Sequence, residues 1–354
     1  MNPLLTVITA ILLFFPSLSF AETKEIISEG TYNMGDGETP SVAESRAVLK
    51  AKQIAVEQAG TYVESYSKVK NITLTQDEIQ VLASGLMEVE ILDKKRTVVG
   101  DGINFWVKIK AKVNPDKMEE MAKRVKEKSV VEDYKRIQES YGKSQKEIEE
   151  LKRQLAAAKD KRKKEIIESD ILTEEREFQA IEWYNKGRLY WLKKEYDDAI
   201  ESFTSASLLM SDFAEAYKAY MGRGSAYRDK GQYDRAFKDY DKAIALNPKS
   251  PEIYVHRGMA FSYKGEQDKA IADFNKAIDL DPNLAIAYVG RGLAYAETDA
   301  SGKAIENYNK ALAIEPEAGT YYYLRGLAYS MQKRYGKAIV DFNKAITIDP
   351  NKIE

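Results

Sequence analysis

The side chains that could carry out chemistry are few in this chain of 354 residues. It contains no cysteine, which excludes disulfides, thiolate metal sites and cysteine nucleophiles. The only histidine, His256, has no serine or cysteine nucleophile motif beside it, and one histidine cannot form a multi-histidine metal site. We therefore predict no catalytic, metal or cofactor site, and we expect His256 to face solvent rather than to act as a base.

The charged residues are nearly balanced, with 54 Lys and Arg against 56 Asp and Glu and a formal net charge of −2. A balance of this kind creates no overall field that would attract nucleic acid or an anionic membrane. We therefore expect no nucleic-acid partner, and binding must depend on local surfaces.

A repeated sequence motif predicts the elements that would position such a surface. The motif appears as AIESFTSASLLMSD, AFKDYDKAIALNPK, AIADFNKAIDLDPN, AIENYNKALAIEPE and AIVDFNKAITIDPN. The copies start at Ala199, Ala236, Ala270, Ala304 and Ala338, so their spacings are 37, 34, 34 and 34 residues. Each copy follows a segment with its own glycine and aromatic residues, such as YMGRGSAYR. The pattern predicts five helix pairs that bury their apolar faces by stacking.

Recurrent glycine, aromatic and proline residues indicate how these helices would pack. A glycine inside a helix costs about 1 kcal/mol relative to alanine, so we expect the first-helix glycines to permit close approach of the second helix. These glycines are Gly187, Gly224, Gly258, Gly292 and Gly326. We expect the aromatic residues of the second helices to fill the space between successive pairs; they are Phe203, Tyr240, Phe274, Tyr308 and Phe342. Pro248, Pro282, Pro316 and Pro350 would end the second helices, with Ser211 in place of proline in the first copy.

The period of 34 and these motifs closely resemble the tetratricopeptide repeat family over residues 180–354. The resemblance implies a mainly α fold, an α-solenoid whose first helices line a groove that binds a peptide or helix, and no enzymatic activity. The matching groove residues here are Tyr184, Arg188, Trp191, Lys218, Met221, Arg228, Met259, Tyr263 and Tyr323. Among them Tyr184, Arg188, Trp191 and Arg228 should contribute most, and two arginines beside aromatic rings favour an acidic, partly apolar ligand.

The end of the fifth repeat has a predicted interface of its own. The sequence stops at Glu354, shortly after the second helix of that repeat, so no further helix would cover Phe342, Ile346 and Ile348. Terminal repeats usually need a polar outer face. We expect these three residues to dock onto another protein or onto a second copy of the chain.

The N-terminus predicts export. Residues 4–15, LLTVITAILLFF, form an apolar run that is followed by the small-residue site Ser19-Phe20-Ala21. This pattern is typical of a signal peptide over residues 1–21 that is cleaved after Ala21, which would make the protein periplasmic or secreted. The alternative is a retained anchor, although the run is shorter than the roughly 20 residues that a spanning helix needs.

Residues 22–115 predict a small α+β domain. Strands are expected at KEIISEGTY, LMEVEILDKKRTVV and INFWVKIKAKV, with GDG as the turn between the last two. An alanine-rich helix, capped by Ser41 and ended by Gly60, would cover one face of the sheet, and Thr75 with Glu78 predicts a capping box on a second helix. The segment resembles the envelope domain of flagellar assembly protein T and of Lpp20-type lipoproteins, which implies a non-enzymatic module of envelope assemblies.

Residues 116–177 predict a long charged helical stalk, with 17 Lys or Arg balanced by 17 Asp or Glu. An apolar heptad stripe runs through it, with Tyr134, Tyr141, Ile148 and Leu155 at equivalent positions. The stripe fits a dimeric coiled coil, and it fits equally a single helix that lies on the α+β domain or the first repeat. The basic run Lys159 to Lys164 is interpreted as a solvated helix face, because acidic residues follow at once.

Together these features predict an exported, non-enzymatic scaffold or adaptor that binds partner proteins through a repeat groove in the bacterial cell envelope. The alternative is an envelope-polymer binder that contacts peptidoglycan or polysaccharide. Saccharide binding would favour planar aromatic residues interleaved with Asp, Asn and Arg, whereas the methionine and aliphatic content of the groove favours a protein ligand.

Overall fold

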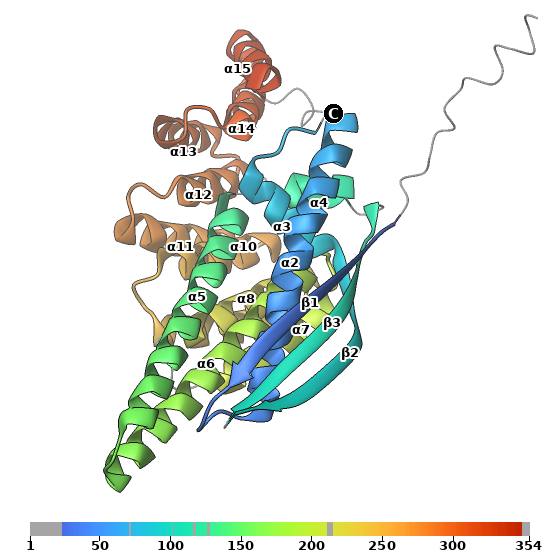
Figure 1. Cartoon of the computed structure of the whole chain (residues 1–354). Coiled ribbons are helices and arrows are strands. Elements are labelled where there is room, and N and C mark those ends of the chain that lie inside the picture. Colours follow the sequence, from blue (N-terminus) through green and yellow to red (C-terminus); the bar gives the residue numbers. More distant parts are fainter. Residues whose placement is uncertain are drawn as a thin grey trace, which may run out of the picture. The chain divides into compact units, whose positions relative to one another are not determined.

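The computed structural model describes residues 23–348 except 71, 101, 116–117, 126–127 and 211–214. The predicted signal peptide, Ser211 and Pro350 therefore lie outside the described residues. The chain divides into two compact units, residues 1–178 and 179–354, and the boundary falls inside helix α6 (Lys161–Leu192). The first unit holds a three-stranded sheet and several helices, and the second is helical throughout its described residues (Figure 1).

The sheet of the first unit has the order β1-β3-β2, and both pairings are antiparallel. Its strands are β1 (Lys24–Met34), β2 (Met87–Val99) and β3 (Gly102–Val113). Every second residue of β3 from Phe105 to Val113 is buried, as the alternating pattern predicts. Helix α2 (Pro40–Val69) lies across the same face of the sheet and buries its alanines there (Figure 1). The small α+β fold is thus confirmed.

Helix α2 departs from the prediction at both ends. Thr39 is the N-cap residue and Pro40 begins the helix, so Ser41 does not cap it. The helix also continues through Gly60 to Val69, because Gly60 packs against α3 (Gln76–Leu86): a Cβ at Gly60 would lie 3.2 Å from Gln80 Nε2. The expected stop was therefore wrong, and Gly60 is a packing glycine. The capping box on α3 is present, with Thr75 accepting from the Glu78 amide.

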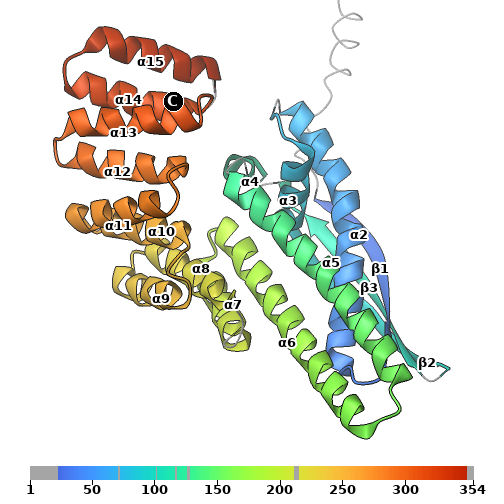
Figure 2. The same cartoon turned by 90° about the vertical axis from the view of Figure 1, so that its left-hand side faces the viewer.

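The predicted single stalk is in fact a helical hairpin of the first unit. Helix α5 (Lys128–Ala157), which follows the short α4 (Met118–Val125), packs against the first part of α6 (Figure 2). Ile148 and Leu155 of α5 share one buried cluster with Ile167 and Ile171 of α6. The heptad stripe is therefore covered within the chain, which favours the intramolecular alternative over a dimeric coiled coil.

Arg46 of α2 explains why Ser144 interrupts the apolar stripe. Its Nη2 donates to Ser144 Oγ at 3.2 Å and its Nη1 donates to Gln145 Oε1 at 3.0 Å. The same guanidinium lies 4.3 Å from the centre of the Phe178 ring. A buried cation needs such partners. Ser144 is therefore polar because it binds Arg46 where α5 contacts α2.

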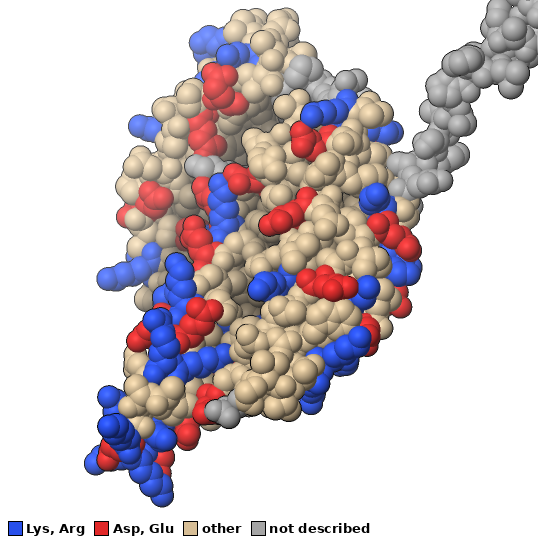
Figure 3. All heavy atoms as spheres, viewed as in Figure 1, with Lys and Arg blue, Asp and Glu red and all other residues tan. Residues whose placement is uncertain are grey.

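The turn between α5 and α6 holds the basic run. The side chains of Lys161, Arg162, Lys163 and Lys164 are all exposed, and Asp160 caps α6 by accepting from the Lys163 amide at 2.9 Å. Figure 3 shows basic side chains gathered at this tip, while the two signs are mixed over the rest of the visible face. The run is a solvated helix start, as the sequence indicates.

The second unit contains five successive helix pairs within its described residues (Figure 2). They are the last part of α6 with α7 (Tyr196–Leu209), α8 (Ala216–Asp229) with α9 (Tyr233–Leu246), α10 (Pro251–Tyr263) with α11 (Gln267–Leu280), α12 (Ala285–Glu297) with α13 (Ser301–Ile314), and α14 (Gly319–Met331) with α15 (Tyr335–Ile348). The predicted solenoid of five pairs is confirmed.

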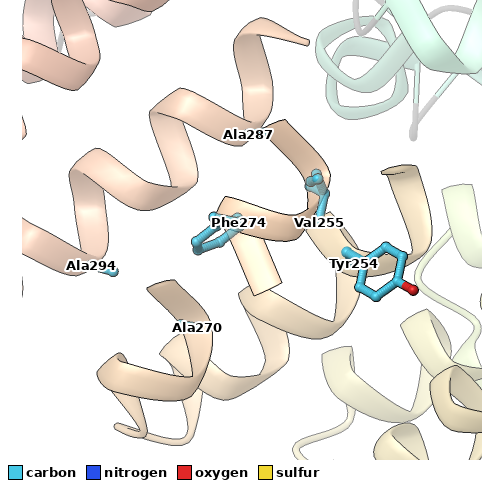
Figure 4. Close-up of a cluster of buried hydrophobic side chains, with 7 residues drawn as sticks. Tyr254, Val255, Ala270, Phe274, Ala287 and Ala294 are labelled. Atoms are coloured by element: carbon cyan, nitrogen blue, oxygen red, sulfur yellow. The ribbon is translucent and has the colours of Figure 1, made fainter. Parts of the chain in front are cut away.

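The first-helix glycines lie directly under the aromatic rings of their own pair. A Cβ at Gly326 would lie 2.6 Å from Phe342 Cε1, which is too close for any side chain at this position unless the ring moves. The sequence predicted these rings between successive pairs, and the structure also places each against the glycine of its own pair. Phe203 does both, since a Cβ at Gly222 of α8 would lie 2.7 Å from its ring. Phe274 also contacts the following pair, because a Cβ at Gly290 of α12 would lie 2.4 Å from its ring (Figure 4).

A ladder of arginines, which the sequence analysis missed, lies in the last four pairs and joins each of them to the pair before it. Each arginine lies directly before the first-helix glycine and binds an Asp or Asn on the second helix of its own pair: Arg223 binds Asp239, Arg257 binds Asp273, Arg291 binds Asn307 and Arg325 binds Asp341. Each also donates from Nη1 to the second helix of the preceding pair; the acceptors are Thr204, Asp241, Asn275 and Asn309, at 3.0, 2.6, 2.6 and 2.7 Å. Every arginine therefore bridges three helices.

Candidate partner-binding site

Hydrogen bonds join the first helices of the first two pairs. Trp191 Nε1 of α6 donates to Asp229 Oδ2 at 2.8 Å, and Arg228 Nε donates to Asp229 Oδ1 at 2.8 Å. Asp229 is the last residue of α8, so its carboxylate reaches the neighbouring helix and its own arginine together. Because both oxygens are engaged, the indole and the guanidinium are held in fixed positions.

The same arginine extends the connection to the third pair. Arg228 Nη1 lies 3.4 Å from His256 Nδ1 and 3.9 Å from Met259 Sδ, and the guanidinium lies 6.0 Å from the centre of the Tyr263 ring. His256, Met259 and Tyr263 all belong to α10. The six residues Trp191, Arg228, Asp229, His256, Met259 and Tyr263, here called the Trp191–Tyr263 cluster, thus span three first helices.

Exposure within this cluster is uneven. Arg228 is only 8% exposed, whereas Tyr263 is 68% exposed. Trp191 and Met259 are half-buried. The arginine is therefore a support that fixes its neighbours, while the tyrosine ring and the exposed edges of the indole and thioether form the surface that a partner can reach.

His256 is half-buried, so it faces solvent less fully than expected. Its ring stacks at 14° on Tyr240 with centroids 6.5 Å apart, and its Nδ1 lies 3.4 Å from Ser225 Oγ. Burial, helped by the positive charge of Arg228, lowers the pKa of His256 to about 4. The imidazole is therefore neutral at physiological pH, and Nδ1 can accept a hydrogen bond from Arg228.

The other predicted groove residues lie elsewhere. Tyr184 and Tyr323 pack on the rings of their own pairs, Phe203 and Phe342, each with centroids 5.7 Å apart. Met221 packs against the cluster around Tyr240, Lys218 pairs with Glu215 at 2.7 Å, and Arg188 is buried. Of the nine predicted residues, the structure brings together Trp191, Arg228, Met259 and Tyr263.

Asp229 is the member of this cluster that the sequence analysis missed. At the positions of Arg228 and Asp229, the other repeats carry Trp191-Leu192, Ser262-Tyr263, Ala296-Glu297 and Ser330-Met331. An Arg-Asp pair occurs only in the second repeat. Departure from the repeat pattern was thus the available signal, and it indicates a contact specific to this place in the array rather than packing shared by all repeats.

The three predicted end residues have different environments. Phe342 packs on Gly326 of its own pair, and Ile348 lies near Gly319, 3.4 Å from the position of a Cβ there. Ile346 is exposed, and so is Ile339, one helical turn before Phe342. Among the described residues, the exposed apolar surface at this end therefore centres on Ile339 and Ile346.

Neither a metal site nor a membrane span is found in the part of the chain that the structure describes. No group of three or more His, Cys, Asp or Glu residues there is arranged to hold a metal ion. None of the described helices combines the length and the apolar character that crossing a membrane requires.

Family models identify the repeats of the second unit. A model described as TPR repeat matches residues 224–265 and 258–299. Models described as tetratricopeptide repeat match residues 320–352, and residues 183–209 and 285–317. The second unit therefore contains tetratricopeptide repeats, as the period of 34 predicts. No curated protein sequence matches the chain significantly.

Solved structures of repeat proteins resemble about half of the chain. MamA protein is 27% identical, with a TM-score of 0.40 over 49% of this chain and 93% of that chain. YrrB, titled a TPR protein with an unusual peptide-binding site, is 23% identical, with a TM-score of 0.39 over 52% and 93%. TTC0263, a thermophilic TPR protein in Thermus thermophilus, is 20% identical, with a TM-score of 0.43 over 49% and 93%. Because these TM-scores lie below 0.5, the repeat assignment rests on the family models and the helix pairs themselves.

Proposed function

We propose that this protein is a non-enzymatic scaffold that binds a segment of a partner protein at the Trp191–Tyr263 cluster. The single observation that carries the proposal is the hydrogen-bonded connection from Trp191 through Asp229 and Arg228 to α10. It holds an exposed tyrosine and a half-buried tryptophan on three adjacent helices. Rigid aromatic residues with such support are the usual source of binding energy at protein interfaces.

The chemistry of the cluster favours a partly apolar, acidic segment. Tyr263 and Met259 offer apolar contact, and the guanidinium of Arg228 places a positive charge beside both of them. A carboxylate on the ligand would be attracted by this charge, although the Arg228 contact with Asp229 weakens the preference.

A variant comparison tests the proposal. Tyr263→Ala removes the exposed ring without touching the core, and Trp191→Phe removes the indole N–H that binds Asp229. Loss of an anchor residue typically costs about 2 kcal/mol, so binding of the partner should weaken about 30-fold. Leu208→Ala, at an exposed residue of α7, is the control and should retain binding. Equal recovery of partners by all three variants from cell extracts would place the site elsewhere.

We further propose that the chain is exported and acts in the cell envelope. The support is the apolar run Leu4–Phe15 followed by Ser19-Phe20-Ala21, and the resemblance of residues 22–115 to an envelope domain. The mature chain would then begin at Glu22. Intact mass of the purified native protein checks this: retention of residues 1–21 together with membrane fractionation after a high-salt wash would contradict cleavage.

A further inference from the structure

A ten-residue segment of helix α15 repeats that of α11 almost without change. Residues 269–278 read KAIADFNKAI and residues 337–346 read KAIVDFNKAI, so the two segments differ only at Ala272 and Val340. Helices with the same surface should accept the same kind of neighbour. The structure shows what covers this surface on α11, and this information can be transferred to α15.

Helix α12 covers α11 through small residues and one arginine. Ala287 and Ala294 of α12 join the buried cluster around Phe274 (Figure 4). Arg291 Nη1 donates to Asn275 Oδ1 of α11 at 2.6 Å. Gly290 lies so close to Phe274 that a side chain there would clash with the ring. The residues that meet α11 therefore follow the pattern A-x-x-G-R-x-x-A.

The corresponding surface of α15 is uncovered among the described residues, which end at Ile348. Ile339 and Ile346 are 58% and 46% exposed. Their counterparts are half-buried in α11, as Ile271 and Ile278, and 7% exposed in α13, as Ile305 and Leu312. Asn343 is exposed, and so is its counterpart Asn275, although Asn275 accepts a hydrogen bond from Arg291. Within the described residues, an apolar surface with one amide acceptor beside it thus lacks the helix that covers it elsewhere in the array.

The aromatic residue of the second helix tells which kind of first helix fits. Where that residue is phenylalanine, the following helix has glycine in contact with it, as in Phe203 with Gly222 and Phe274 with Gly290. Where it is tyrosine, the same position holds a larger residue: His256 after Tyr240 and Leu324 after Tyr308. Since α15 carries Phe342, its neighbour should carry glycine.

We propose that the surface of α15 formed by Ile339, Phe342, Asn343 and Ile346 binds a helix of another protein with the pattern A-x-x-G-R-x-x-A, whose arginine donates to Asn343. A second copy of this chain does not offer such a helix. Its two matching segments, AYMGRGSA in α8 and AYVGRGLA in α12, are already covered in the array. The corresponding positions of α6 hold Glu182, Asn185, Lys186 and Leu189. This inference does not depend on the function proposed for the Trp191–Tyr263 cluster.

A helix-stapled peptide that copies residues 284–298 is the probe. Its helicity is verified by circular dichroism, and its binding to the full chain is measured by fluorescence anisotropy. We expect saturable binding that weakens at least tenfold when the peptide carries Gly290→Leu or Arg291→Ala. In the protein, Ile346→Asp and Asn343→Ala should weaken binding likewise. Val340→Asp is the matched control, because Val340 is exposed and its counterpart Ala272 stays exposed when α12 covers α11.

Three outcomes overturn the proposal. The first is no saturable binding of a peptide that is helical. The second is binding that Gly290→Leu and Ile346→Asp leave unchanged, or that Val340→Asp weakens as much. The third is self-association of the chain in sedimentation that Ile346→Asp abolishes, which would assign the surface to a second copy.

Discussion

At the scale of single residues, the arginine ladder sets this array apart from a simple stack of apolar helices. Arg257 binds Asp273 through two hydrogen bonds of 2.7 Å, and Arg291 binds the neutral Asn307 through one of 2.8 Å. Both acceptors are buried. The chain therefore contains a charged and a neutral version of the same contact, which makes the contribution of charge measurable.

Removing these two arginines should have unequal effects. Arg257→Ala leaves the Asp273 carboxylate buried without a counter-charge, so we expect a loss of about 3–5 kcal/mol in the free energy of unfolding. Arg291→Ala leaves only a neutral amide and should cost about 1–3 kcal/mol. Urea denaturation of both variants checks the difference. Equal losses would show that helix bridging, rather than the buried charge, dominates the contact.

His256 makes the second unit sensitive to acid. Its pKa falls from 6.5 to about 4 on folding, chiefly because of burial. Above pH 6.5 the imidazole is neutral in both the folded and the unfolded state, so it does not lower the free energy of unfolding. Between pH 6.5 and 4 the unfolded state binds a proton that the folded state does not, and stability falls as the pH falls. We expect a loss of about 1–2 kcal/mol between pH 7 and pH 5.

Thermal denaturation of the wild type and of His256→Asn measures this effect. The variant should lose less stability between pH 7 and pH 5 than the wild type does. The loss of stability that other titrating groups cause is the same in both proteins, so it cancels in the comparison. An identical pH dependence of the two proteins would contradict the neutral, enclosed state of the imidazole.

At the scale of elements, the turn inside each helix pair requires a left-handed residue. Gly231 and Gly265 adopt φ values of 73° and 86° there, while Lys194, Asp299 and Lys333 adopt 61°, 56° and 59°. These five positions are spaced like the repeats themselves. Glycine accepts this conformation freely, whereas other residues are strained by about 1–2 kcal/mol.

Two glycine-to-alanine substitutions should therefore have opposite signs. Gly265→Ala should lower stability by about 1 kcal/mol through backbone strain alone, since nothing lies within 4 Å of the new Cβ. Gly336→Ala, inside α15 and equally unobstructed, should raise stability by up to about 1 kcal/mol. Melting temperatures check both. A stabilising Gly265→Ala would disprove the left-handed turn.

The stability of the α5–α6 hairpin should depend on pH in the opposite direction. Glu174 lines a pocket of about 350 Å³ with Glu147, Glu150 and Asp170, and its Oε2 has no hydrogen-bond partner. Burial first, and then the charges of Glu147 and Glu177, raise the pKa of Glu174 to about 7, although Lys143 opposes this. The folded state keeps a proton that the unfolded state has released above pH 4.5, so stability falls as the pH rises towards 7.

Glu174→Gln should therefore stabilise the first unit at pH 8 and have little effect at pH 4.5. Hydrogen exchange of α5 and α6 amides in the full chain gives a readout specific to this unit. Glu165→Gln, at an exposed position of α6, is the control. Equal protection of wild type and variant at pH 8 would show that the carboxyl is ionised there without cost.

At the scale of the whole molecule, periodicity made the second unit predictable. The spacing of 34 residues specified the pairs, and the alternation in β3 specified the buried face of the sheet. The arginine ladder was also visible, since Arg precedes glycine in four repeats and Asp or Asn follows sixteen residues later. It was missed because the glycines alone were used to explain packing.

What the sequence left open or missed involves contacts between segments far apart in sequence. The stripe of α5 fitted both a dimer and an intramolecular contact, because nothing local shows that Ile167 and Ile171 return to cover it. His256 looked exposed because its enclosure depends on Arg228 and Tyr240 of the preceding pair. The Trp191–Tyr263 cluster was predicted only in part. Asp229 accepts hydrogen bonds from Trp191 and Arg228, and the repeat pattern gives no sign of this contact because the other repeats lack an Asp at that position.

Site-specific photocrosslinking at Tyr263 tests the central claim, that this chain binds a partner protein at the Trp191–Tyr263 cluster, most directly. A photoreactive phenylalanine analogue replaces Tyr263 in one variant and the exposed Leu208 in another, and both are irradiated in the native cell. The account predicts a discrete protein adduct at position 263 that disappears with Trp191→Ala and is absent at position 208. Adducts at position 208 alone, or the same adducts at both positions, would contradict it.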